Sequence, residues 1–406
     1  MTRAARTLVR SGDVLLHWID GQLSLVRLGS AQRIPVPTGA IHVLDAFSQA
    51  REPAEVAARF GRSDSEREAI AQTIADLERI GALRDPERRY DELYFDAFSG
   101  LVIHETMLRD SPRLDAYARA IAAQVRPGDT VIDAGTGTGV LAMLAAKAGA
   151  SKVYALDRAR VGEIARELFV RNGVADRVEF VQTDLDDFNP PERVSAIVSE
   201  TFGHIGHVEG TVGALGRLAR RALVEGGAMI PTALEVHCAP LSAPEVYRAR
   251  VGVFAEPLHG LDFSMVRRTV MSSARSEECI AAETVLAAAQ LANRHEFLTD
   301  DAEVWERQLL FGVERQGRFD GLGLYFDLDL GAGVRLSTAF DQPATHWHQT
   351  WVPVEPMDVE QGDSIGVRIR LSPAARELRK IDLDVHCGVL RADRLDPEYR
   401  SRVFVR

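Results

Sequence analysis

The stretch Asp133-Ala134-Gly135-Thr136-Gly137-Thr138-Gly139 follows a short apolar run, Val131-Ile132, and decides which fold this chain is expected to have. Glycines directly after a strand let the backbone approach a ligand closely and direct amide groups of the following helix at it. A dinucleotide-binding loop would have its third glycine at position 140, where this chain has Val140. The Asp-x-Gly-x-Gly-x-Gly form instead favours S-adenosylmethionine, because the carboxylate of Asp133 suits the cationic amino and sulfonium groups of that cofactor.

From about residue 90 to residue 231, short apolar segments alternate with helical ones. Further strands are expected at residues 153–157, 178–181 and 196–198. This alternation predicts right-handed βαβ units, a parallel Rossmann-like sheet, and ligand-binding residues at the carboxyl ends of its strands. At those ends, Asp157 is placed to bind two ribose hydroxyls, and Asp184 or Asp186 to meet the adenine amino group.

Segments with other patterns flank this sheet on both sides. Residues 1–86 predict a small winged-helix-like α+β domain, because two apolar runs flank the turn Asp20-Gly21 and the stretch Ser63-Asp64-Ser65-Glu66 has the spacing of a capping box. Beyond Pro231, strand-like runs follow one another. This pattern of consecutive strands favours an antiparallel β-barrel domain over residues 232–406.

Composition and charge argue against several classes of function. The net charge of −11 disfavours nucleic acid, because its binding depends on Lys and Arg that neutralise phosphates. No apolar run approaches the length of a membrane span and no signal peptide is evident, so we expect a cytoplasmic protein without membrane contact. The 3 cysteines lie far apart, and we expect neither disulfides nor a metal site.

Three separate motifs resemble the protein arginine methyltransferase family, over about residues 90 to 406. The family's cofactor-covering helices are matched at residues 94–98, at 103–110 and at Arg113, its double-glutamate loop at Ser199-Glu200-Thr201-Phe202-Gly203 with Glu209, and its threonine-histidine-tryptophan loop at Thr345-His346-Trp347. The resemblance implies a methyltransferase sheet followed by a β-barrel. It also implies a dimerisation arm at about residues 243–268 and a head-to-tail homodimer.

The resemblance further implies roles for individual residues. The cofactor-binding residues are expected to be Phe95, Met107, Arg113, Asp133, Gly135, Gly137, Gly139, Asp157, Asp186 and Glu200. Within this set, Arg113 is expected on the cofactor carboxylate, and Asp186 rather than Asp184 at the adenine. Phe98, His204 and Trp347 are expected to contact the substrate, and Glu200, Glu209, His346 and Asp110 to form the catalytic group.

The chemistry of a guanidinium favours this catalytic group independently of the family resemblance. A guanidinium is planar, has a pKa above about 12 and offers its donors as a fork, so two converging carboxylates, Glu200 and Glu209, can grip it. When the charge is held on the other nitrogens, one nitrogen lone pair is aimed at the methyl group, and transfer needs mainly positioning. His346, paired with Asp110, is placed to accept the released proton.

Several positions depart from the family pattern. The family loop usually reads Glu-Trp-Met-Gly-Tyr, whereas this chain has Thr201, Phe202 and His204 there, and Phe98 stands where a tyrosine is common. The acceptor therefore stays open. An arginine in a ribosomally made precursor peptide is the first hypothesis, and a histidine, a small guanidine compound or another group is its alternative. A second alternative is a binding module that senses the cofactor without turnover.

Residues 1–86 are similar to the small peptide-recognition domains, of the pyrroloquinoline-quinone D-protein type, that are fused to enzymes modifying such precursor peptides. The matching features are the Asp20-Gly21 hairpin and the segments 37–40 and 53–57 that open helices. The resemblance implies that a leader peptide binds as an added strand along the sheet edge. The alternative is a cap that packs on the catalytic part or on another subunit.

Overall fold

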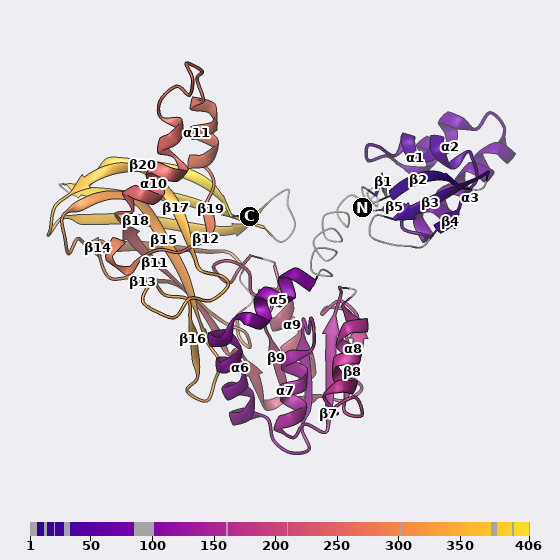
Figure 1. Ribbon diagram of the computed structural model, residues 1–406, viewed down its shortest axis with the longest axis horizontal. Coiled ribbons are helices and arrows are strands. Elements are labelled where there is room, and N and C mark those ends of the chain that lie inside the picture. The colour runs from indigo at the N-terminus through magenta and orange to yellow at the C-terminus, as the bar shows by residue number, and fades with distance from the viewer. Residues whose placement is uncertain are drawn as a thin grey trace. The chain divides into compact units, whose positions relative to one another are not determined.

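Figure 1 shows the protein as a computed structural model. The structure describes residues 6–11, 14–19, 21–27, 33–84, 101–159, 161–208, 210–300, 303–374, 380–391 and 394–405. The chain forms two compact units, residues 1–94 and 95–406, and each is described by itself.

The N-terminal unit is an α+β structure with two small antiparallel sheets, ordered β2-β3-β4 and β1-β5. Its elements are β1 (Val9–Arg10), β2 (Val14–Ile19), β3 (Gln22–Arg27), β4 (Arg33–Pro35), α1 (Ala40–Ala46), α2 (Pro53–Phe60), α3 (Asp64–Arg79) and β5 (Leu83–Arg84). The predicted hairpin is confirmed, because β2 pairs with β3 and Leu16 lies opposite Leu25. Gly21 in its turn has a φ of 78°, and Asp20 lies outside the described residues.

Helix α3 begins where the sequence predicts. The Ser63 hydroxyl accepts a hydrogen bond from the Glu66 amide, and the Glu66 carboxylate accepts one from the Ser63 amide, so the capping box is confirmed. Leu77 of this helix packs in one core with Leu44 and Phe47 of the α1 segment. The winged-helix arrangement of this unit stays a prediction.

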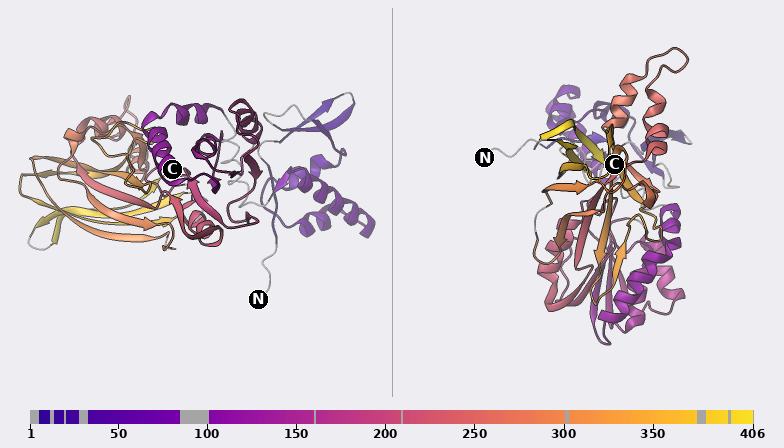
Figure 2. Two further views of the ribbon diagram at one scale, coloured as in Figure 1. Left: turned by 90° about the horizontal axis from the view of Figure 1, so that it is seen from below. Right: turned by 90° about the vertical axis from the view of Figure 1, so that its left-hand side faces the viewer.

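The second unit begins with the parallel sheet. Its five strands are β6 (Thr130–Ala134), β7 (Lys152–Asp157), β8 (Val178–Gln182), β9 (Val194–Ser199) and β10 (Leu223–Ile230). They run in the order β10-β9-β6-β7-β8 with every pairing parallel, which confirms the predicted Rossmann-like sheet. Helices lie on both faces of this sheet (Figure 2). The helices of this part are α5 (Leu101–Arg109), α6 (Ser111–Gln124), α7 (Val140–Ala148), α8 (Gly162–Arg171) and α9 (Val212–Ala222).

Antiparallel strands follow from residue 233 onward, as predicted. A six-stranded sheet contains β11 (Ala233–Leu241), β12 (Arg275–Glu278), β13 (Gln290–Glu296), β15 (Gly317–Asp329), β16 (Arg335–Ser337) and β17 (Gln349–Val359). A four-stranded sheet contains β14 (Trp305–Gly312), β18 (Ser364–Pro373), β19 (Ile381–Arg391) and β20 (Arg394–Val405). The two sheets share one apolar core, to which Phe311, Phe319 and Leu383 belong, and this arrangement is barrel-like.

The segment expected to be an arm stands out from the barrel strands in Figure 1 and in the right-hand view of Figure 2. It contains α10 (Pro244–Arg250), a 3₁₀ turn (Gly252–Phe254) and α11 (Ser264–Met271). Leu261 and Met265 expose 62% and 66% of their surface, so this segment presents apolar side chains to solvent. A second 3₁₀ turn spans Ala282–Thr284. Among the helices of the described ranges, none is both long and apolar enough to cross a membrane.

Candidate active site

The glycine loop follows β6 and has a backbone that only glycine adopts without strain. Gly135, Gly137 and Gly139 have φ values of 79°, 52° and 85°, in the left-handed region. A Cβ on Gly135 would collide with Thr201, and one on Gly139 with the ring of Phe169. The chain can therefore pass this close to Thr201 and Phe169 only because the two glycines carry no side chain.

Asp133 lies beneath this loop and is fully buried. Its Oδ2 accepts hydrogen bonds from the Thr136 hydroxyl at 2.6 Å and from the Ala142 amide at 2.8 Å. Burial raises the pKa of this carboxyl to about 7, against the lowering effect of these two hydrogen bonds. Asp133 thus holds the loop and the start of α7 together, and its direct contact with cationic cofactor groups stays a prediction.

Asp157 ends β7 directly beside the loop, as the sequence predicts. Its carboxylate accepts hydrogen bonds from the Gly137 amide at 2.8 Å and the Ala159 amide at 2.7 Å, and burial raises its pKa. His104 of α5 lies over the same place, because its ring atoms come within 3.0 and 3.3 Å of the point where a Cβ on Gly137 would stand. No role was expected for His104 from the sequence. Its spacing could have suggested one, because His104 lies three residues before Met107 and therefore on the same face of a helix as that expected cofactor-binding residue.

Asp186 lies on the loop after β8, apart from this cluster. Its two carboxylate oxygens accept hydrogen bonds from Arg217 of α9, both at 2.9 Å, and these hold its pKa low. Asp184 pairs with Arg158 at 3.0 Å instead. An adenine contact by Asp186 would have to share a carboxylate that already serves Arg217, so this contact stays a prediction.

Arg113 and Glu200 form an ion pair at the end of β9. Their side chains are only 4% and 6% exposed. Arg113 also donates to the carbonyl of Met107 at 2.6 Å, and the hydroxyl of Tyr117 donates to the Ser199 carbonyl at 2.8 Å, which fixes the strand end. Burial raises the pKa of Glu200, while the guanidinium of Arg113 acts in the opposite direction.

Asp110 and His346 are brought together from positions far apart in the sequence. Asp110 Oδ2 lies 2.7 Å from Nδ1 of His346 and accepts a hydrogen bond from its backbone amide at 2.9 Å. Asp110 also caps α6, because Oδ1 accepts from the Arg113 amide at 3.1 Å. Burial raises the pKa of Asp110, but these hydrogen bonds outweigh it and the pKa is lowered. The pair therefore adjoins the Arg113–Glu200 pair.

Residues 200–208, here named the acceptor loop, run between the two cores. Phe202 packs in the core of the parallel sheet, whereas Ile205 and Val208 pack in the core of the barrel. Ile205 has a φ of 51°, a conformation that is rare for a β-branched residue and is held by the surrounding packing. The indole N–H of Trp347 donates to the Phe202 carbonyl at 2.6 Å. His204 is partly exposed on this loop.

Three of the expected site residues, Phe95, Phe98 and Glu209, lie outside the described residues. The roles expected of them stay predictions. The structure does bring Arg113, Glu200, Asp110 and His346 into one cluster beside the glycine loop.

Comparisons with known proteins relate two parts of the chain to methyltransferases. A family model described as the arginine methyltransferase oligomerization subdomain matches residues 234–389, and one described as ribosomal protein L11 methyltransferase (PrmA) matches residues 116–205. The chain is 26% identical over 348 residues to histone-arginine methyltransferase CARMER of Drosophila virilis, covering 81% of this chain and 64% of that protein. It is 26% identical over 340 residues to probable protein arginine N-methyltransferase 6 of Arabidopsis thaliana, covering 72% of this chain and 78% of that protein. The chain is thus similar to the protein arginine methyltransferases in sequence and in fold.

Solved structures of arginine methyltransferases have the same fold. The PRMT1 enzyme-prozyme complex of Trypanosoma brucei with AdoHcy matches with a TM-score of 0.72 and 25% identity, over 77% of this chain and 100% of that one. Protein arginine methyltransferase 10 of Arabidopsis thaliana matches in fold with a TM-score of 0.66 and 24% identity, over 77% of this chain and 99% of that one. The chain spans 64% of the length of the CARMER relatives.

Proposed function

We propose that the chain is an S-adenosylmethionine-dependent N-methyltransferase that modifies an arginine guanidinium in a peptide or protein. The observation that supports this most is the environment of Glu200. Its carboxylate is buried at the end of β9, beside the glycine loop, and it accepts a hydrogen bond from a guanidinium, that of Arg113. A site that holds one guanidinium in this way is suited to hold another.

The cofactor supplies an electrophilic methyl group. Arg113 is proposed to bind the cofactor carboxylate, which would release Glu200 for the acceptor guanidinium. Asp157 is proposed to bind the ribose, and His104 joins the expected set because it lies over Gly137. The other cofactor contacts are proposed as expected from the sequence.

His346 is proposed to accept the proton that leaves the acceptor nitrogen. The carboxylate of Asp110 lies 2.7 Å from Nδ1, so it fixes the imidazole orientation and stabilises the imidazolium. Nε2 is then the atom left to take up the proton. Glu200, with Glu209 as its proposed partner, would hold the positive charge on the remaining guanidinium nitrogens.

The clamp is tested with Glu200→Gln, which keeps the side-chain shape and removes its charge. We expect kcat to fall by at least about a hundredfold, the scale of losing one charge-stabilising group in an active site. Cofactor affinity should change far less, because Glu200 is only one of the proposed cofactor contacts. Glu105→Gln is the control, because Glu105 is 61% exposed and pairs with Arg109. Unchanged turnover in Glu200→Gln, or an equal loss in both variants, would contradict the clamp.

The acceptor is tested with labelled cofactor. Mass spectrometry of arginine-containing and histidine-containing peptides, and of small guanidine compounds, locates the transferred methyl group. Label on arginine supports the proposal, and label on any other group contradicts it. Cofactor binding without any transfer would support a sensing module instead.

The N-terminal unit is proposed to recruit a precursor peptide. In the described part of this unit, β2 pairs on one side only, and its Leu15 and Trp18 are 42% and 60% exposed. An extended peptide could add to this edge through backbone pairing, with the exposed apolar side chains as its contacts. We expect Trp18→Ser to raise the peptide KM at unchanged kcat, and Phe60→Ser, which removes a 41% exposed aromatic from α2, to leave KM unchanged. Equal KM values in both variants would contradict peptide binding at this edge and would favour the alternative, in which the N-terminal unit is only a cap.

The arm is proposed to join two copies of the chain head to tail. Its exposed Leu261 and Met265 are candidates for the contact, and the matched family model describes an oligomerization subdomain. We expect Leu261→Asp with Met265→Asp to yield monomers in analytical ultracentrifugation. A wild type that sediments as a monomer would contradict the homodimer.

A further inference from the structure

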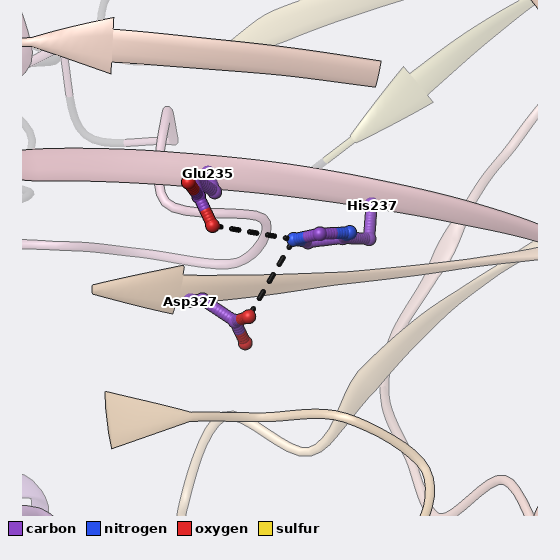
Figure 3. Close-up of side chains that lie close together, drawn as sticks. All are labelled: Glu235, His237 and Asp327. Atoms are coloured by element: carbon purple, nitrogen blue, oxygen red, sulfur yellow. Dashed lines mark ion pairs between the residues drawn. The ribbon is translucent and has the colours of Figure 1, made fainter. Parts of the chain in front are cut away.

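One histidine and two carboxylates converge on a face of the six-stranded barrel sheet. Glu235 and His237 are two residues apart on β11 and so point to the same face, and Asp327 lies directly opposite Glu235 on β15. Their side chains are only 10%, 17% and 14% exposed. Figure 3 shows a ring nitrogen of His237 directed between the two carboxylates.

The distances among these groups fit a shared metal ion better than hydrogen bonds. His237 Nε2 lies 3.7 Å from Glu235 Oε2 and 3.5 Å from Asp327 Oδ2, and the three ligand atoms lie within 4.8 Å of one another. N–H···O hydrogen bonds are usually shorter than about 3.2 Å, and within the described ranges Nε2 has no hydrogen-bond partner. Two ligands that each lie about 2.1 Å from a tetrahedral metal ion are about 3.4 Å apart.

The charges around these side chains also favour a cation. Glu235 and Asp327 face each other on adjacent strands, and like charges in that position destabilise a sheet. Arg294 and Arg335 offset this in part. These two guanidinium groups form ion pairs with four carboxylates, however: Glu235, Glu296, Asp327 and Asp329. Negative charge is therefore in excess.

Arg335 already contacts two of these three side chains. Its guanidinium contacts Glu235 Oε2 and Asp327 Oδ2, the same two oxygens that face His237. Its side chain is 53% exposed, so it can turn into solvent without disturbing the core. Arg294 contacts the other oxygen of Glu235, Oε1, and can remain in place.

We infer that Glu235, His237 and Asp327 bind one divalent transition-metal ion of the zinc class, which takes the place of the Arg335 guanidinium. An imidazole nitrogen with two carboxylate oxygens suits Zn²⁺, whereas Mg²⁺ prefers oxygen ligands alone. The ion would tie β11 to β15 across this face, independently of methyl transfer. No metal site was expected from the sequence, because only Glu235 and His237 lie close together in it and Asp327 lies on a separate strand.

Zinc binding to the full chain tests this inference. After treatment with EDTA and its removal, isothermal titration with ZnCl₂ should give one site per chain, and zinc should raise the melting temperature. His237→Gln should weaken this binding by about tenfold or more, because losing a ligand should cost at least as much as losing an outer-shell partner. Arg335→Gln should strengthen it, since the competing cation is gone.

His386→Gln is the matched control. His386 Nε2 lies 3.1 Å from a single carboxylate, that of Glu398, on the other barrel sheet. Zinc binding should survive in this variant, and the melting temperatures of all variants in EDTA report whether they are folded. No zinc binding by the wild type, or equal loss in His237→Gln and His386→Gln, overturns the site. Binding that Arg335→Gln leaves unchanged overturns the exchange of guanidinium for metal.

Discussion

The glycine loop and the acceptor loop follow neighbouring parallel strands, β6 and β9, yet they are held in different ways. Contacts within the α/β layer hold the glycine loop, among them those with Asp157 at the end of β7. Asp133 binds Thr136 and Ala142, which are three and nine residues away. The loop's shape then follows from glycines that adopt positive φ.

Residues distant in the sequence hold the acceptor loop. Ile205 and Val208 reach into the barrel core, Phe202 stays in the core of the sheet, and Trp347 binds the Phe202 carbonyl across 145 positions. The proposed donor site thus depends on one α/β layer, whereas the proposed acceptor site depends on both halves of the unit. Substitutions should therefore separate cofactor binding from transfer.

Gly139→Ala should have the largest effect and should disturb the donor side. A Cβ would collide with Phe169 at a φ of 85°. Left-handed strain and overpacking together should lower the free energy of unfolding by about 3 kcal/mol, and cofactor affinity should fall with it. Urea unfolding and a cofactor titration measure the two effects.

Gly173→Ala is the control for that change. Gly173 has a φ of 66°, but a Cβ there would meet open space. Strain alone should cost it about 1 kcal/mol. If both glycine variants lose the same stability, the close packing against Phe169 is not what the loop requires.

Trp347→Phe should act on the acceptor side alone. It keeps an aromatic ring but leaves the buried Phe202 carbonyl without its indole donor, at a cost of about 1–3 kcal/mol. If that cost loosens the acceptor loop, kcat should fall by about tenfold, with cofactor affinity unchanged. Trp305→Phe is the control, because the buried Trp305 indole N–H has no partner in the described part of the chain. Weaker cofactor binding in Trp347→Phe would mean that the acceptor loop also affects the donor site.

The difference between the loops also explains how much could be predicted from the sequence. The strands, the glycine loop and the position of Asp157 beside it follow from local patterns, and the structure has them where expected. Asp110 and His346 are 236 residues apart, and only the family resemblance brought them together beforehand. Tertiary packing brings Thr201 against Gly135 and anchors Ile205 in the barrel core. Such contacts leave no periodic pattern in a single sequence.

Asp133→Asn should change how the stability of the folded chain depends on pH. In the folded chain Asp133 keeps its proton up to about pH 7, whereas an unfolded aspartic acid releases it near about pH 4. The folded state therefore binds more protons between these values, and its stability falls as the pH rises. Between pH 5 and pH 6 this contribution is about 1 kcal/mol. We expect Asp133→Asn to remove it, as measured by urea unfolding without cofactor. An identical slope in the variant would mean that Asp133 is ionised in the folded chain.

His207 should give the acceptor loop a pH dependence of the opposite sign. Burial lowers its pKa to about 3, with a smaller contribution from His295. An unfolded histidine takes up a proton below about pH 6.5, so the unfolded state binds more protons and stability falls as the pH falls. Between pH 7 and pH 5.5 the loss is about 1 kcal/mol. His207→Phe keeps an apolar ring between Trp305 and His295 and should abolish this acid sensitivity, while leaving the opposite slope from Asp133 in place. If His207→Phe retains the acid sensitivity, the buried histidine is not its source, and the two loops do not differ in the sign of their proton linkage.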